Sequence, residues 1–164
     1  MSRTGLLAQS VTLYTLFTRR RTAVTAMGGL RHLRSNLGIT TMATQDELNA
    51  LITAVANDIN GFIGASVVDV ESGLPLASNS VRPDFDLDVA SAYNSEMVKN
   101  KRKTIDALRL DAHLEDMLLT LDTQLHLLKM VDDDTFIYLA ADRQATNIAL
   151  LRSSVNRHVA ALNT

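Results

Sequence analysis

The chain has 164 residues, enough for one domain and a tail, and its hydrophobic fraction (46%) and charged fraction (21%) are those of an ordinary globular protein. It contains no cysteine, which excludes disulfides, thiolate nucleophiles and cysteine-ligated zinc. No apolar run approaches the roughly 18 residues of a membrane-spanning helix, so we expect no membrane insertion. The net charge of −2 is the sum of two oppositely charged parts of the chain. Residues 1–42 carry six arginines and no acid, whereas residues 43–164 carry all 18 acids.

We therefore divide the chain into a basic leader rich in Ser, Thr and Arg (residues 1–42) and one domain (residues 43–164). Three interpretations of the leader remain open. It resembles an organellar targeting peptide in being arginine-rich and acid-poor, and it also fits a disordered arm for acidic partners. Alternatively, the leader is not part of the native protein, because Met42 directly precedes a helix start and could begin translation. Arg19–Arg21 follow the apolar run instead of preceding it, which disfavours a secretory signal.

The domain begins with a predicted helix. Thr44 to Glu47 form a capping box, in which an N-cap Thr is followed three residues later by Glu. The helix then shows one apolar stripe at helical spacing: Leu48, Leu51, Ile52, Val55 and Ile59. Asn60-Gly61 is expected to end it, since glycine adopts the left-handed conformation without a steric penalty.

A β-hairpin follows. Residues 62–70 (FIGASVVDV) are apolar or small on both alternating faces, which predicts a central strand covered on both sides. Glu71-Ser72-Gly73 predicts a tight turn. The returning strand, Leu74–Ser78, contains Pro75, which cannot donate a ladder hydrogen bond, and is therefore expected at an edge of the sheet.

A second helix is predicted from about residue 85 to 103, with its end anywhere up to Arg109 and its apolar side formed by Ala90, Tyr93, Met97 and Val98. Short linkers then separate three further strands, predicted at Leu114–Asp122, Leu125–Val131 and Thr135–Ala141. The last helix is predicted from Arg143 to Leu162, with a buried stripe of Ile148, Leu151, Val155, Val159 and Leu162. The fold class is thus α+β, a five-stranded antiparallel sheet with flanking helices in the order α-β-β-α-β-β-β-α.

No pattern typical of catalysis is present. The histidines show no i, i+4 pair and no carboxylate at ligand spacing (His32, His113, His126, His158), and neither a nucleophile elbow nor a phosphate-binding glycine loop occurs. Asp132–Asp134 lacks the alternate ligands and central glycine of a calcium loop, so a solvated hairpin turn is the better interpretation. Asp69 and Glu71 could be interpreted as a catalytic carboxylate pair. Both flank a tight turn, where acids are commonly solvated, and the sequence offers no partner base for them. We expect no enzyme activity, no cofactor and no metal.

Two basic features have weak functional interpretations. The Lys99–Lys103 cluster could contact nucleic acid, but the domain is acidic and poor in aromatic residues, so we expect a solvated helix end and no nucleic-acid partner. Arg82, beside a proline in a predicted loop, could act as an arginine finger towards a partner GTPase, which a lone loop arginine supports only weakly.

Three stretches carry a family resemblance. Residues 48–78 look like the first helix and hairpin, residues 85–108 like the long second helix, and residues 115–155 like the three-stranded meander and final helix of the roadblock family. That family (roadblock/LC-seven-like proteins) includes bacterial regulators of Ras-like GTPases and dynein-associated light chains, and its fold is a roadblock/profilin-like sandwich. The resemblance spans nearly all of residues 43–164 and rests on element order and local pattern.

The resemblance implies a homodimer in which the third strands pair across subunits and the second helices pack beside the seam. Carried over to this chain, the interface lies in residues 115–122 and 85–103, and we predict that it includes Tyr93, Met97, Asp116, Leu118 and Thr120. The sequence is compatible with this placement, because the run LEDMLLTLD (114–122) is an apolar strand with few charges in its middle, which at an edge would invite pairing.

The resemblance also implies a function, a non-enzymatic cytoplasmic regulator or scaffold that binds a small Ras-like GTPase. Neither composition nor spacing points to such a partner. Two alternatives remain. A PAS- or GAF-type sensory domain would need a roomy cavity with polar groups, whereas the predicted strand interiors here are ordinary Leu, Val and Met. A longin-like trafficking module usually begins with a strand, whereas Thr44–Asn60 predicts a helix.

Overall fold

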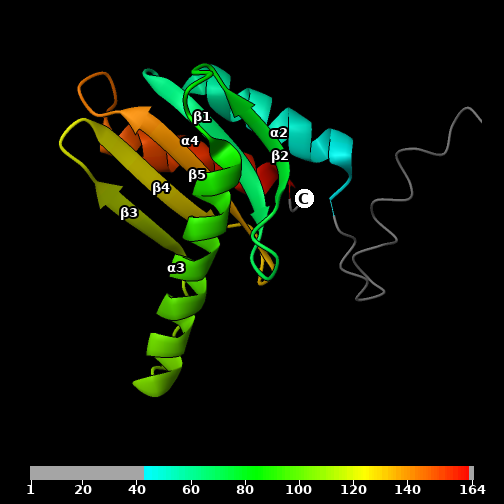
Figure 1. The fold of residues 1–164 in the computed structure, drawn as a ribbon, viewed down its shortest axis with the longest axis vertical. Coiled ribbons are helices and arrows are strands. Elements are labelled where there is room, and N and C mark those ends of the chain that lie inside the picture. The colour runs from blue at the N-terminus through cyan, green and yellow to red at the C-terminus, as the bar shows by residue number, and fades with distance from the viewer. Residues whose placement is uncertain (1–42, 163–164) are drawn as a thin grey trace, which may run out of the picture. The chain divides into compact units, whose positions relative to one another are not determined.

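The computed structural model describes residues 43–162, so the predictions for residues 1–42 lie outside the described part of the chain. The element order is α-β-β-α-β-β-β-α, as predicted (Figure 1). The elements are α2 (Gln45–Asp58), β1 (Phe62–Asp69), β2 (Pro75–Ser80), α3 (Leu87–Ala107), β3 (Asp116–Thr120), β4 (Gln124–Met130), β5 (Thr135–Asp142) and α4 (Ile148–Leu162). Within this part of the chain, no helix combines the length and apolarity needed to cross a membrane.

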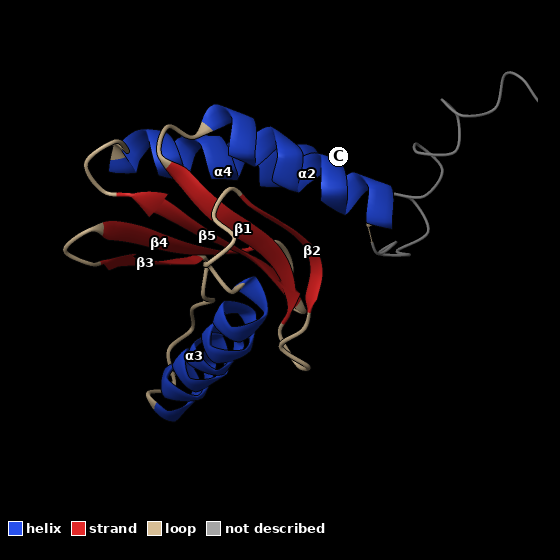
Figure 2. Cartoon of the chain, turned by 45° about the horizontal axis from the view of Figure 1, so that its top comes forward, coloured by secondary structure: helices blue, strands red, loops and turns tan. Residues whose placement is uncertain are grey.

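The five strands form one antiparallel sheet in the order β2-β1-β5-β4-β3. Helices α2 and α4 cover one face and α3 crosses the other (Figure 2). β1 is buried along most of its length between β2 and β5, which confirms the central strand expected from its two apolar faces. β2 lies at an edge and begins at Pro75, where the missing N–H removes no ladder bond.

The main core lies between the sheet and the α2–α4 layer. The capping box forms as predicted, since Thr44 Oγ1 accepts from Glu47 N and the Glu47 carboxylate accepts from Thr44 N. Four of the five predicted stripe residues of α2 are buried within the helix, and Ile59 is buried at its C-cap. Each such aliphatic side chain contributes about 1.5–3 kcal/mol to folding by leaving water.

Helix α3 packs on the face of the sheet opposite to α2 and α4. The buried side of α3 is largely small and polar: Leu87, Ser91, Asn94, Ser95 and Val98. Ser91 Oγ lies 2.9 Å from Ser66 Oγ of β1, so the helix approaches the sheet closely. Of the predicted apolar side, Val98 is fully buried, whereas Tyr93 is 74% exposed. The apolar residues of α3 thus do not all face the sheet, because close packing on β1 selects small residues there.

The start of the last helix was predicted wrongly. α4 begins at Ile148 and not at Arg143, because Asp142 Oδ1 accepts from the backbone N–H groups of Gln144 and Ala145 and holds a turn there. Asn147 Oδ1 then accepts from the N–H groups two and three residues on, as an N-cap does. Ile148, predicted in the buried stripe, is 42% exposed at the first turn of the helix.

Candidate functional site

The two edges of the sheet are unlike. The β2 edge is blunted, because it starts with Pro75, its register against β1 shifts between Val67 and Val68, and Gln45 Nε2 of α2 donates to the Leu76 carbonyl at 2.8 Å. Within residues 43–162, no element pairs with the outer side of β3. The β3 edge is therefore the one at which another strand can be added.

Hydrogen bonds at both ends of β3 establish which of its backbone groups face outwards. Leu121 N donates to Gln124 O at 2.9 Å, and Met130 N donates to Glu115 O at 3.0 Å. In an antiparallel ladder, bonded pairs alternate with non-bonded ones, so residues 115, 117, 119 and 121 direct their N–H and C=O groups to β4. Asp116, Leu118 and Thr120 direct theirs to the open edge. These are the three β3 residues predicted for the interface.

The side chains of these three residues point towards the α4 layer. Asp116 accepts from Arg152 of α4 at 3.0 Å (Nε) and 2.8 Å (Nη2), and Leu118 packs against the core under α2 and α4. The opposite side of β3 carries Met117 and Leu119, which are half-buried against the α3-side core. The sequence prediction missed these two, although the alternation along the strand separates the two sets.

An apolar stripe on α3 lies on the same side of the sheet as Met117 and Leu119. Val89, Tyr93 and Met97 follow at i, i+4 and i+8 and are 52%, 74% and 38% exposed. Lys99 and Ser95 face the β1–β2 turn, since Lys99 Nζ donates to Glu71 O and Ser95 Oγ would lie 2.7 Å from a Cβ on Gly73. Met97 lies about 200° around the helix from both, and so points away from that turn.

The open β3 edge and this α3 stripe together form the candidate site, which we call the β3–α3 surface (residues 116–120 with Val89, Tyr93 and Met97). All five residues predicted for the interface belong to it. It combines unpaired backbone groups with exposed apolar side chains, which suits association with another protein.

Next to this surface lies a partly buried polar network around His126. Tyr138 Oη is 3.2 Å from His126 Nδ1, and Gln124 Oε1 is 2.9 Å from His126 Nε2, so both ring nitrogens are engaged. Burial lowers the pKa of His126 and raises the pKa of Tyr138 to about 12. Both groups are therefore neutral near neutral pH, and the network is a satisfied part of the core.

The acidic candidates hold turns. Asp69 Oδ1 accepts from the Ser72 hydroxyl at 2.5 Å and from Ser72 N at 2.7 Å, and these bonds hold the pKa of Asp69 below its ordinary value. Asp132 Oδ1 likewise accepts from Asp134 N and Thr135 N. Among residues 43–162, no group of three or more His, Asp or Glu side chains could hold a metal ion.

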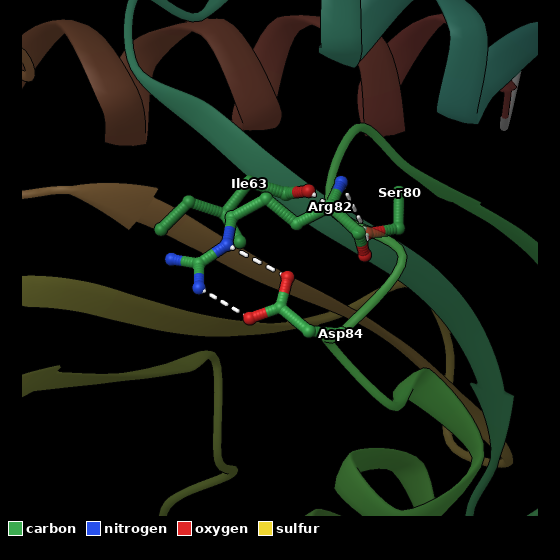
Figure 3. Close-up of polar contacts among 4 residues, drawn as sticks. All are labelled: Ile63, Ser80, Arg82 and Asp84. Carbon is green, nitrogen blue, oxygen red and sulfur yellow. Dashed lines mark hydrogen bonds and ion pairs between the residues drawn. The ribbon is translucent and has the colours of Figure 1, made fainter.

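Arg82 is engaged within its own loop (Figure 3). Its guanidinium forms a two-point contact with Asp84, at 3.2 Å from Nε to Oδ1 and 2.5 Å from Nη2 to Oδ2, and this contact lowers the pKa of the Asp84 carboxyl. Ser80 Oγ accepts from Arg82 N and donates to Ile63 O, which ties the loop to β1. An arginine finger would have to leave Asp84 first.

The basic cluster of α3 is likewise partly engaged by its own domain. Lys99 pairs with Glu96 at 2.6 Å, and the hydrogen bond to Glu96 is the main reason that the pKa of Lys99 is raised. Arg102 donates to the Asp133 carbonyl at 2.6 Å, which joins α3 to the β4–β5 turn. Both contacts fit a helix end held in place against neighbouring turns.

No protein-family model matches the chain, and no curated protein matches its sequence. Solved structures match its fold. A roadblock/LC7 domain from Streptomyces avermitilis matches with a TM-score of 0.62 at 18% identity, over 70% of this chain and 93% of that one. MglB from Myxococcus xanthus matches with a TM-score of 0.67 at 12% identity, over 76% of this chain and 91% of that one. An MglB in a tetrameric arrangement matches with a TM-score of 0.64 at 14% identity, over 73% of this chain and 87% of that one. The chain therefore has the roadblock/LC7 fold, as its element order and local patterns predicted.

Proposed function

We propose that this chain, which has the roadblock/LC7 fold, is a non-enzymatic regulator or scaffold for a small Ras-like GTPase and works as a homodimer. The observation that carries the proposal is the β3–α3 surface on this fold, which combines an open strand edge with exposed Tyr93 and Met97 of the helix on one face of the sheet. The choice of a GTPase as the partner rests on the family resemblance seen in the sequence. The self-association rests on the open strand edge and the exposed apolar side chains.

Self-association is favoured because pairing with a second copy would cover both the free backbone groups of β3 and the exposed side chains of α3. A second β3 strand would satisfy the outward N–H and C=O groups, and the second α3 would cover the half-exposed side chains beside it. Tyr and Met are enriched where protein surfaces meet, since each offers a large apolar area. The MglB with a tetrameric arrangement is a self-associating protein of the same fold, which supports the proposal.

A sensory PAS- or GAF-like function has less support. A cavity of about 380 Å³ lies at the surface where the end of α3 meets the β4–β5 turn, and its lining mixes Arg102, His113, Glu115 and Lys129 with apolar side chains. The interior between sheet and helices is instead filled by Leu, Val, Ile and Phe side chains. A longin-like module usually begins with a strand, whereas the first element of residues 43–162 is the helix α2.

The GTPase proposal is tested by titrating the full chain against the Ras-like GTPases of its source organism, each loaded with GDP or with a non-hydrolysable GTP analogue. We expect saturable binding by calorimetry with a dissociation constant of about 10 μM or tighter, and a preference for one nucleotide state. Phosphate release from GTP is measured with and without the chain, which distinguishes an activator from a tether.

The matched control is the chain alone with GTP, for which we expect no phosphate release. A chain that hydrolyses GTP unaided would contradict the non-enzymatic part of the proposal. Absence of binding to any of these GTPases in either nucleotide state, from a folded dimeric sample, would refute the choice of partner and leave the dimer standing.

A further inference from the structure

We infer that the cavity at the C-terminal end of α3 is a docking site for a basic segment of another protein. This α3-end cavity, of about 380 Å³, opens between the end of α3, the connection to β3 and the β4–β5 turn. It is lined by Arg102, Ile105, Asp106 and residues 112–115 and 129–133. No lining residue belongs to the β3–α3 surface, so the site would take a partner in addition to the one proposed above.

A turn at Arg109 forms one wall of the cavity. Arg109 has a φ of 53°, the left-handed conformation that glycine usually adopts after a helix. Leu110 N donates to Ile105 O at 3.1 Å, and Arg109 N donates to Asp106 O at 2.9 Å, which is the bond pair of a Schellman motif. The connection therefore turns back at the end of α3, and residues 112–115 line the cavity together with the last turns of the helix.

The apolar part of the lining is only half-buried. It consists chiefly of Ile105, Leu114, Met130 and Val131. Leu114 and Met130 also pack against the α3-side core, and Val131 packs against the core under α2 and α4. The two cores therefore fix the positions of these side chains. An aliphatic side chain of a partner would remove their remaining apolar area from water.

The charged part of the lining favours a cation. With His113 neutral, four carboxylates and two cations line the cavity: Asp106, Glu115, Asp132 and Asp133 against Arg102 and Lys129. Asp132 Oδ1 accepts from two backbone N–H groups of its turn. Within residues 43–162, no hydrogen bond or ion pair engages the carboxylates of Asp106, Glu115 and Asp133. Arg102 leaves the Asp133 carboxylate free, because it donates to the backbone carbonyl of that residue.

The end of α3 adds to this preference. A helix C-terminus carries a partial negative charge, which a nearby cation stabilises. The last turn of α3 contains no basic residue, so the turn itself does not supply that cation. A lysine or arginine side chain of a partner would meet the helix end and the free carboxylates at one place, with its aliphatic part on the apolar lining. The same carboxylates would repel the phosphates of a nucleic acid or of an anionic membrane, which is why we assign the site to a protein segment.

The site is tested with the full chain and a fluorescent pentapeptide in which lysine and leucine alternate, by fluorescence polarisation at low ionic strength. We expect saturable binding with a dissociation constant of about 100 μM or tighter. A second peptide, with glycine in place of each leucine, should bind at least about fivefold more weakly, because it cannot cover the apolar lining. The comparison separates a docked segment from a polyamine-like attraction of charge alone.

Isosteric variants locate the binding. Asp106→Asn and Asp133→Asn should each weaken binding of the lysine–leucine peptide at least about threefold, and the double variant D106N/D133N at least about tenfold. Both carboxylates lack hydrogen-bond partners within residues 43–162, so we expect these variants to melt as the wild type does. Asp122→Asn, the same change in the β3–β4 turn at the other end of β4, is the matched control and should alter binding less than about twofold.

Three outcomes would overturn the inference. Equal weakening by Asp122→Asn and by D106N/D133N would mean that the peptide is attracted by the acidic domain as a whole. Equal affinity for the two peptides would mean that the apolar lining takes no part. No binding of the lysine–leucine peptide at about 1 mM would mean that the cavity is not a docking site for such a segment. None of these outcomes bears on the homodimer or on the GTPase, because the changed residues lie outside the β3–α3 surface.

Discussion

Gly73 shows how a single residue sets the distance between two layers. It has a φ of 72° in the β1–β2 turn, and a Cβ there would lie 2.7 Å from Ser95 Oγ and 3.2 Å from Ala92 Cα of α3. The turn thus needs glycine for its backbone and for its close approach to the helix. The sequence identified the turn and its glycine, but not the helix that the glycine touches.

We predict that Gly73→Ala lowers the free energy of unfolding by about 1–3 kcal/mol, because it adds left-handed strain to a clash with α3. Denaturant titration measures the change. The double variant G73A/S95A should recover part of the loss, since it removes the nearest contacting atom while the strain remains. An unchanged midpoint for Gly73→Ala would show that the turn does not require glycine.

Asp58 is a second residue with a measurable role, at the end of α2. Its Oδ2 accepts from His158 Nε2 at 2.7 Å, Arg157 Nη2 at 2.5 Å and Ser154 Oγ at 3.2 Å, all from α4. The hydrogen bond from His158 is the largest cause of the lowered pKa of Asp58, followed by that from Arg157. These contacts join the two helices on the same face of the sheet.

A lowered carboxyl pKa stabilises the fold fully above the ordinary value of 3.8 and ceases to do so as pH falls through the folded-state pKa. We therefore predict that Asp58→Asn lowers the melting temperature at pH 6, and that its difference from the wild type shrinks as pH falls below about 4. Thermal melts across this pH range measure it. Asp133→Asn, at another exposed acid, is the control. A difference that grows towards acid would contradict the assignment.

At the scale of elements, α4 shows how local capping overrides helix propensity. Arg143, Gln144 and Ala145 are good helix formers, yet the Asp142 side chain holds two of their N–H groups in a turn. Asn147 supplies the cap from which the helix actually starts. The five residues lost from the predicted helix instead form the connection between β5 and α4.

We predict that Asn147→Ala destabilises the fold by about 1 kcal/mol through loss of this cap, and that Asn147→Asp is nearly neutral because its carboxylate can accept the same bonds. Gln144→Ala, whose side chain makes no described contact, serves as the matched control. Equal stability of Asn147→Ala and Gln144→Ala in urea titrations would show that α4 does not depend on Asn147.

At the scale of the whole molecule, the two sheet edges decide how the protein can associate. β2 carries a proline, a register shift and a covering glutamine, whereas β3 within the described part of the chain carries none of these. Such a difference between edges is expected when one edge must avoid pairing and the other must permit it.

We predict that Leu118→Lys weakens the homodimer at least about tenfold in dissociation constant, since two lysines would meet at the seam. Light scattering over a concentration series measures the mass. Ser78→Lys, which also introduces a lysine but at the opposite edge, should leave the mass unchanged. Equal effects of the two variants, or none from Leu118→Lys, would mean that another surface is used.

Much of the fold could be predicted because its signals are local. The apolar stripe of α2, the uniformly apolar β1 and the Gly73 turn each lie within a few residues of the chain, and periodicity or backbone conformation reveals them. Within β3, the candidate site was predicted on one face of the strand only. Asp116, Leu118 and Thr120 carry the outward backbone groups, but Met117 and Leu119 face α3, which the two similar apolar patterns of β3 did not distinguish.

The sequence by itself determined the fold class, the order of the elements and the absence of known catalytic motifs, because hydrophobic periodicity and turn chemistry act over short distances along the chain. Only the tertiary structure decided that β1 pairs with β5, that small polar residues of α3 face the sheet, and that Tyr93 and Met97 are left exposed. These features depend on contacts between residues that are far apart in the chain. Such contacts are chosen by mutual packing and by the pairing of backbone groups, so no single segment encodes them.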